Sequence, residues 1–158
     1  MSLSELVEKA ESGLRTHLVE IAGAAQTALY FSGALYGEHL QALAENGLRD
    51  YDFLQGHLSD FGAIAAETAL NLGAVHYWGR RDGWSDKRLR FMEYVLLCIP
   101  ATLHSMKEIT ELMDPNFTFD PVDILAYIGG AVAAYGSYQL SKSVKKRWEG
   151  RREQKEES

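Results

Sequence analysis

The chain has few of the residues on which disulfide-stapled and zinc-bound folds depend, with one cysteine, Cys98, in 158 residues. A single cysteine excludes an internal disulfide and any zinc site built from several cysteines. Because Cys98 lies in an apolar run, we expect it to be a buried packing residue. Long runs of leucine, isoleucine or valine are also scarce. The mean hydropathy of −0.21 is accordingly low, and it weighs against placing the chain in a membrane.

Motifs of the common enzyme classes are missing as well. The sequence contains no G-x-S-x-G turn, no phosphate-binding loop and no glycine-rich dinucleotide motif. We therefore predict no catalytic residues and no cofactor, although the absence of motifs does not decide whether the protein is an enzyme. Nucleic-acid binding is not expected, because the basic clusters lie far apart and carry no readout motif. The N-terminus has no apolar core and is not expected to be a cleaved signal peptide.

The distribution of basic residues is the strongest pattern that is present. Four weakly charged, helix-like stretches lie near residues 20–37, 58–78, 91–106 and 121–141. Fourteen of the sixteen Lys and Arg residues lie before the first stretch, between the second and third, or after the fourth. Only Arg49 and Lys107 lie in the other two connections, which are rich in acid. The positive-inside rule gives this alternation to a four-span membrane protein with both termini in the cytoplasm.

The pattern predicts an all-α fold, a four-helix transmembrane bundle over residues 1–143, with a charged cytoplasmic tail over 144–158. The first and last stretches carry no charge over 17 and 18 residues, Ile21–Gly37 and Ile124–Ser141. These lengths approach the roughly 20 residues that span a bilayer core. We therefore predict that the chain is located in a membrane, as a multi-pass protein. Its predicted partner is the lipid bilayer, and another membrane protein or a second copy of the chain is a further possible partner.

Small residues recur at four-residue spacing within these stretches. Gly33 and Gly37 form a GxxxG pair, while Gly129 and Gly130 each precede an alanine by four residues. Such spacing lets helix backbones approach closely, so we predict helix packing at these four glycines. An alanine-rich helical hairpin outside the membrane is the alternative explanation.

Four polar residues within the stretches are candidates for a ligand or proton site, namely Glu67, Asn71, Glu93 and Asp123. A carboxylate at mid-membrane depth must be neutral, paired or part of a pathway. A second group lies at the predicted outer ends of the helices, where we expect a rim formed by His57, Asp60, His104, Glu108 and Glu111 together with Asp123. The spacing matches no recognised ligand motif, so a hydrogen-bonded network is expected there and no metal site.

The segment 104–136 resembles the C-terminal half of the VanZ-like family of small membrane proteins. Glu108, Asp123 and Gly130 match the family's Glu, Asp and Gly. Three positions depart from it: Glu111 stands for Gln, Asn116 for Arg, and Tyr127 for Asn. The resemblance covers about a fifth of the chain. It implies a protein of four to six spans, and no reaction, because the family has no settled biochemical activity.

Three functions follow from these patterns. The first is a non-catalytic, VanZ-like membrane protein that acts at the cell envelope or as a partner subunit. The second is a membrane protein that binds or moves a proton, an ion or a lipid-like ligand through intramembrane carboxylates. The third, which the low hydropathy favours, is a soluble four-helix interaction module.

Overall fold

The fold is known from a computed structural model, which describes residues 2–47, 57–111 and 120–156. This part of the chain is helical and contains no strand. It comprises five helices, α1 (Leu3–Thr16), α2 (Leu18–Glu45), α4 (Leu58–Arg81), α5 (Asp86–Glu111) and α6 (Pro121–Glu156). The four predicted stretches lie within α2, α4, α5 and α6, and the predicted tail largely continues α6. Asn116 lies outside the described residues.

Local chemistry explains where several helices begin and end. Ser2 and Glu5 form a capping box at the start of α1, because each side chain bonds the other residue's backbone N–H. At the start of α6, the Asp120 carboxylate accepts a hydrogen bond from the backbone N–H of Val122 at 2.8 Å. Gly83, with φ of +68°, provides the left-handed conformation in the short turn between α4 and α5.

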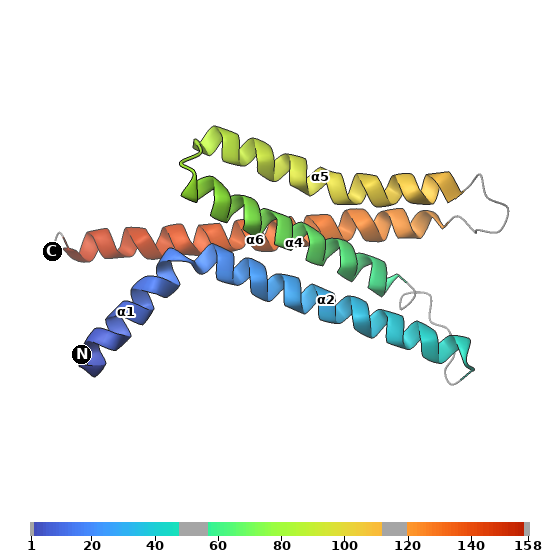
Figure 1. Cartoon of the computed structure of the whole chain (residues 1–158), viewed down its shortest axis with the longest axis horizontal. Helices are drawn as coiled ribbons and strands as arrows, with labels where there is room; N and C mark the ends of the chain where they lie inside the picture. The colour runs from blue at the N-terminus through green and yellow to red at the C-terminus, as the bar shows by residue number, and fades with distance from the viewer. Residues whose placement is uncertain (1, 48–56, 112–119, 157–158) are drawn as a thin grey trace.

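Helix α4 is the centre of the bundle, and it packs against α2, α5 and α6. Figure 1 shows α2 and α5 on opposite sides of the α4–α6 pair, while α1 projects away from the bundle and the end of α6 extends beyond it. Buried residues of α4 are mostly small. Ala65 and Ala69 pack with Ala134 of α6, and Ile64 packs with Tyr127.

Glycines mark the places where helix backbones approach most closely. A Cβ atom added at Gly62 of α4 would lie 2.7 Å from the Ala34 backbone nitrogen of α2. One added at Gly130 of α6 would lie 2.4 Å from the Phe61 carbonyl oxygen of α4. Of the other predicted packing glycines, Gly37 meets the α4 backbone, at Ser59, in the same way.

The remaining two predicted packing glycines are less closely approached. A Cβ at Gly129 would make an ordinary contact with the Phe61 ring at 3.5 Å, and Gly33 has nothing within 4 Å. Of the four predicted packing glycines, Gly37 and Gly130 are therefore closely packed, whereas Gly33 and Gly129 are not.

Membrane crossing is not supported by the described helices, since none is both long and apolar enough for it. The predicted transmembrane bundle and multi-pass membrane localisation are therefore wrong for this structure. The physical reason is composition. The helices are long, but alanine and glycine supply much of their apolar content, and polar residues such as Glu67 and Glu93 interrupt them.

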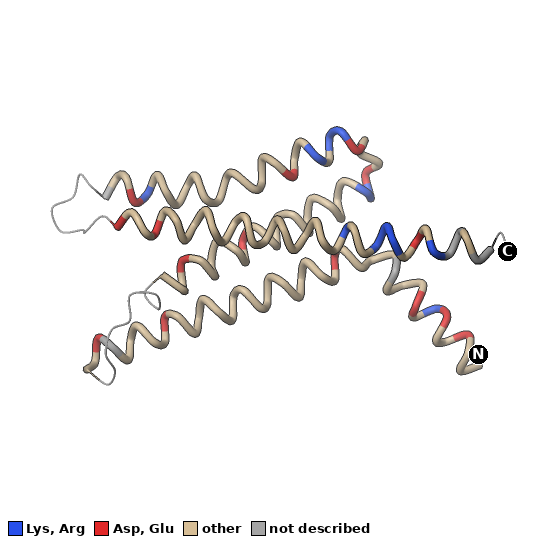
Figure 2. Tube along the Cα trace, turned by 180° about the vertical axis from the view of Figure 1, so that it is seen from behind, with Lys and Arg blue, Asp and Glu red and all other residues tan. Residues whose placement is uncertain are grey.

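The uneven charge distribution of the sequence becomes a polarity from one end of the bundle to the other. Figure 2 shows Lys and Arg gathered where α4 turns into α5 and along the final part of α6, with some Asp and Glu among them, while the charged residues at the opposite end are mostly Asp and Glu. Antiparallel helices explain this, because alternate connections meet at the same end. The bundle therefore carries potentials of opposite sign at its two ends.

Cys98 is exposed on α5, which corrects the expectation that it is buried. The apolar run around it does contain buried residues, but Cys98 lies on the side of the helix that faces away from α4 and α6. Large apolar side chains share that outward side, including Phe91 and Met106, which are 65% and 56% exposed.

Candidate functional site

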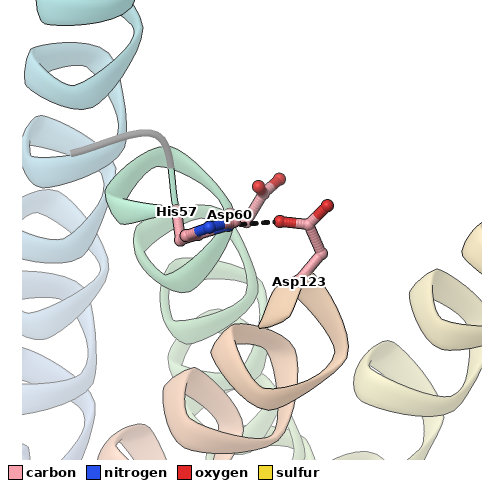
Figure 3. Close-up of side chains that lie close together, drawn as sticks. All are labelled: His57, Asp60 and Asp123. Carbon is pink, nitrogen blue, oxygen red and sulfur yellow. Dashed lines mark hydrogen bonds and ion pairs between the residues drawn. The ribbon is translucent and has the colours of Figure 1, made fainter. Parts of the chain in front are cut away.

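A cluster of one histidine and three carboxylates joins α4 to α6 at the acidic end of the bundle. His57 directly precedes α4, Asp60 lies in the first turn of α4, and Asp123 lies in the first turn of α6. The His57 Nδ1 atom is 2.5 Å from Asp123 Oδ1, and Figure 3 marks this contact with a dashed line. On the other side of the ring, Nε2 is 3.7 Å from Asp120 Oδ2. The histidine therefore bridges carboxylates from the start of α6.

The position of the cluster explains why so many carboxylates can gather. Both Asp60 and Asp123 lie in the first turns of helices, where the helix dipole and unpaired backbone N–H groups favour negative charge. The His57 side chain is 12% exposed, so its interaction with Asp123 is partly protected from water. This arrangement ties together the N-terminal ends of two neighbouring helices.

The charged form of Asp60 is disfavoured by its surroundings in the cluster. Its pKa is raised to about 6, first by burial and then by the negative charges of Asp123 and Glu108, while His57 acts in the opposite direction. Close carboxylates of like charge favour protonation of one of them. Protonation of Asp60 therefore relieves part of the repulsion within the cluster.

A second layer of polar residues lies below the cluster. Glu108 of α5 is buried and accepts a 2.8 Å hydrogen bond from the Tyr127 hydroxyl of α6. Burial and this bond raise the pKa of Tyr127. The Tyr127 ring also contacts His104, with 5.4 Å between ring centroids. Through Glu108 and Tyr127, the network extends to α5.

Three ligand atoms, one each from His57, Asp60 and Asp123, lie within 4.8 Å of one another. One imidazole and two carboxylates are suitable ligands for a divalent cation. In the structure, however, Nδ1 already bonds Asp123. The contacts present are those of a hydrogen-bonded ion-pair network.

Replacing Asp60 by asparagine is expected to stabilise the protein at neutral pH. A carboxyl group whose folded pKa is raised stabilises the folded state below its unfolded pKa of 3.8. That contribution is lost as pH rises through about 6. At pH 7.5 the variant should gain about 1–2 kcal/mol, less than the full shift implies because solvent screens a half-buried group.

Thermal unfolding at pH 4.0 and 7.5 in the presence of a chelator measures this difference. The gain should disappear at pH 4.0, where Asp60 is protonated in the folded state. Asp82→Asn, at an exposed position beyond the end of α4, is the matched control and should show no such pH dependence. A destabilised Asp60→Asn variant at pH 7.5 would contradict the assignment.

The four residues predicted to form a ligand or proton site do not lie close together in the structure. Asp123 belongs to the cluster above, whereas Glu93 lies toward the basic end of the bundle. Glu67 is 45% exposed, with its Oε2 atom 3.6 Å from His104 Nε2. Asn71 is half-buried on α4. These four residues do not form one site.

Most residues of the predicted outer rim do lie close together in the structure. Its members His57, Asp60 and Glu108 come together with Asp123, and His104 is adjacent through Tyr127. Glu111 is the last residue of α5. Asp120 and Tyr127 are the participants that the rim prediction left out, and the signal for Asp120 is its position as N-cap of α6.

A separate buried network surrounds Glu93. Glu93 is 1% exposed, and its Oε1 atom accepts hydrogen bonds from the Tyr138 hydroxyl and from Lys142 Nζ, both at 2.7 Å. Gln139 donates to the other carboxylate oxygen at 3.4 Å. The pKa of Tyr138 is raised by burial and by its bond to Glu93. Tyr138 and Lys142 are four residues apart on one helix face, which is the signal that sequence reasoning missed.

Comparison with known proteins adds no assignment, because no family model, curated protein or solved structure matches the chain. The resemblance of residues 104–136 to the VanZ-like family therefore stays a prediction.

Proposed function

We propose that the protein is a non-catalytic helical interaction module that pairs with a second copy of itself through the outer face of α5. The observation that carries this proposal is the exposure of large apolar side chains on that face. We define the α5 face by its exposed members, which are Phe91, Tyr94, Cys98, Ile99, Leu103, Met106 and Ile109.

The α5 face extends along the helix and is interrupted by the exposed Thr102 and Thr110. At 100° per residue its members fall within about half of the helix circumference. From Phe91 to Ile109 the face extends about 27 Å at 1.5 Å per residue. Apolar surface of this extent is unusual for an isolated protein, and it is typical of a contact surface.

Charge complementarity favours another copy of the chain as the occupant, in antiparallel orientation. Helix α5 begins with Asp86 followed by the basic residues Lys87, Arg88 and Arg90, and its last turns carry the exposed Lys107, the buried Glu108 and Glu111, so its start is net basic and its end net acidic. The whole bundle has the same polarity (Figure 2). An antiparallel pair places the basic end of one copy beside the acidic end of the other, whereas a parallel pair would bring like charges together.

The expected result is that the wild-type chain sediments as a dimer in analytical ultracentrifugation at micromolar concentration. Met106→Glu, which places a charge within the α5 face, should produce a monomer. Because Met106 is 56% exposed, the substitution should leave the fold and its helical circular dichroism unchanged.

Leu140→Glu is the matched control, since Leu140 is 65% exposed but lies on α6, outside the α5 face. This variant should remain a dimer. A monomeric wild type, a dimer that survives Met106→Glu, or a chain that needs detergent to stay dispersed would each overturn the proposal. The last outcome would point to lipid as the occupant of the face.

A further inference from the structure

Two neighbouring cavities lie at the basic end of the bundle, with volumes of about 470 and 300 Å³. Four residues line both of them, His76, Arg80, Lys142 and Lys146. Lys145 adds a further cation to the larger cavity and Arg90 adds one to the smaller. The acidic residues among the described lining residues are Glu149 in the larger cavity and Asp86 and Glu93 in the smaller one. Volumes of this size suit small-molecule ligands, and the excess of cations indicates a ligand that is an anion.

His76 is the buried group that lacks a partner at these cavities. Its side chain is 2% exposed, and its Nε2 atom has no hydrogen-bond partner within the described part of the chain. The nearest charged group is Glu20 Oε1, at 3.9 Å. A buried polar atom without a partner is costly, so its presence beside a cavity indicates a missing ligand atom.

The hydrogen bonds around His76 determine which proton it carries. Tyr138 donates its single hydroxyl proton to Glu93, so the 3.1 Å contact with His76 Nδ1 requires Nδ1–H to be the donor. In the neutral ring, Nε2 is then a bare acceptor. Nε2 therefore suits a ligand atom that brings a proton.

The surroundings keep His76 neutral while the cavities are empty. The pKa of His76 is lowered to about 4, mainly by burial and also by the positive charges of Arg80, Lys142 and Lys145, while only Glu20 opposes them. An anion bound among these cations would reverse part of this effect. A phosphate group has a second pKa near 6, so it carries a proton in mildly acidic solution, whereas sulfate does not.

We propose that the two cavities form a binding site for the phosphate group of a small molecule, in which Arg80 and Lys145 neutralise its charge and His76 Nε2 accepts its remaining proton. Lys142 lines both cavities and also donates a hydrogen bond to Glu93, so it connects the site to the buried network. Arginine and lysine donate charge-assisted hydrogen bonds to phosphate oxygens.

Titration of the full chain with inorganic phosphate at pH 6.0 and constant ionic strength tests the proposal, with the His76 ring resonances observed by NMR. The expected result is a saturable shift of these resonances and a rise in the pKa of His76. Sulfate should bind about tenfold more weakly, because it leaves Nε2 without a proton donor. His76→Gln identifies the resonances and should abolish the preference for phosphate over sulfate.

Arg80→Gln should weaken phosphate binding about tenfold through loss of a charge-assisted hydrogen bond. Arg81→Gln is the matched control, because Arg81 stacks on Trp78, with its guanidinium 4.9 Å from the ring centroid, and is not among the lining residues of either cavity. Equal binding of phosphate and sulfate, equal loss in the two arginine variants, or no saturable shift would overturn the proposal.

Discussion

Replacing Lys142 by methionine is expected to lower the free energy of unfolding by about 3–5 kcal/mol, because it leaves the buried Glu93 carboxylate without its cation. Glu93 is 1% exposed, and the Lys142 Nζ atom lies 2.7 Å from Glu93 Oε1. Tyr138 and Gln139 still donate hydrogen bonds to the carboxylate, but neither neutralises its charge. Urea unfolding followed by circular dichroism at pH 7.5 measures the loss.

Two further variants separate the charge effect from a loss of packing. Glu93→Gln combined with Lys142→Met removes both charges, so the double variant should recover most of the stability that Lys142→Met loses. Lys146→Met, one helical turn further along α6 at an exposed position, should change stability by less than about 0.5 kcal/mol. If the double variant were no more stable than Lys142→Met, the buried ion pair would not be the cause.

Replacing Gly130 by alanine is expected to cost about 1–3 kcal/mol, because the added methyl group must displace α6 from α4. Its Cβ would lie 2.4 Å from the Phe61 carbonyl oxygen and 3.2 Å from the Ala65 backbone nitrogen. Since both contacts are to backbone, no side-chain rotation can relieve them. Thermal unfolding should show a midpoint lowered by about 3–10 °C for a domain of this size.

Gly136→Ala provides a control of opposite sign on the same helix. A Cβ at Gly136 meets nothing within 4 Å, so the substitution should stabilise the protein by about 0.5–1 kcal/mol through helix propensity alone. A gain in stability at both positions would mean that α4 and α6 do not approach as closely at Gly130 as the structure indicates.

The helical elements were predictable, whereas their environment was not. The charge-poor stretches place four of the helices correctly, because composition and periodicity are local properties of the sequence. The alternation of basic connections was interpreted as membrane topology. Antiparallel helices produce the same alternation as an end-to-end charge polarity, so charge pattern alone does not distinguish the two cases.

For the polar residues too, some contacts were predictable from the sequence and others were not. Assigning His57, Asp60, Glu108 and Asp123 to one rim required only the correct order and direction of the helices. Connecting Glu93 to Tyr138 and Lys142 required the rotation of α5 and α6 about their own axes, which depends on packing. Glu67 was selected by its depth in a presumed membrane, and its exposure in the structure removes that reason.

Disulfide cross-linking within the α5 face tests the proposed self-association most directly. Phe91 and Met106 lie on either side of the midpoint of α5, so an antiparallel pair brings Phe91 of one copy beside Met106 of the other. With Cys98→Ser as background, we mix chains carrying Phe91→Cys with differently tagged chains carrying Met106→Cys and oxidise them. The account predicts rapid formation of the mixed 91–106 disulfide and little formation of the 91–91 or 106–106 disulfide. Preferential 91–91 and 106–106 disulfides, or no cross-link above the level of an exposed cysteine on α6, would contradict it.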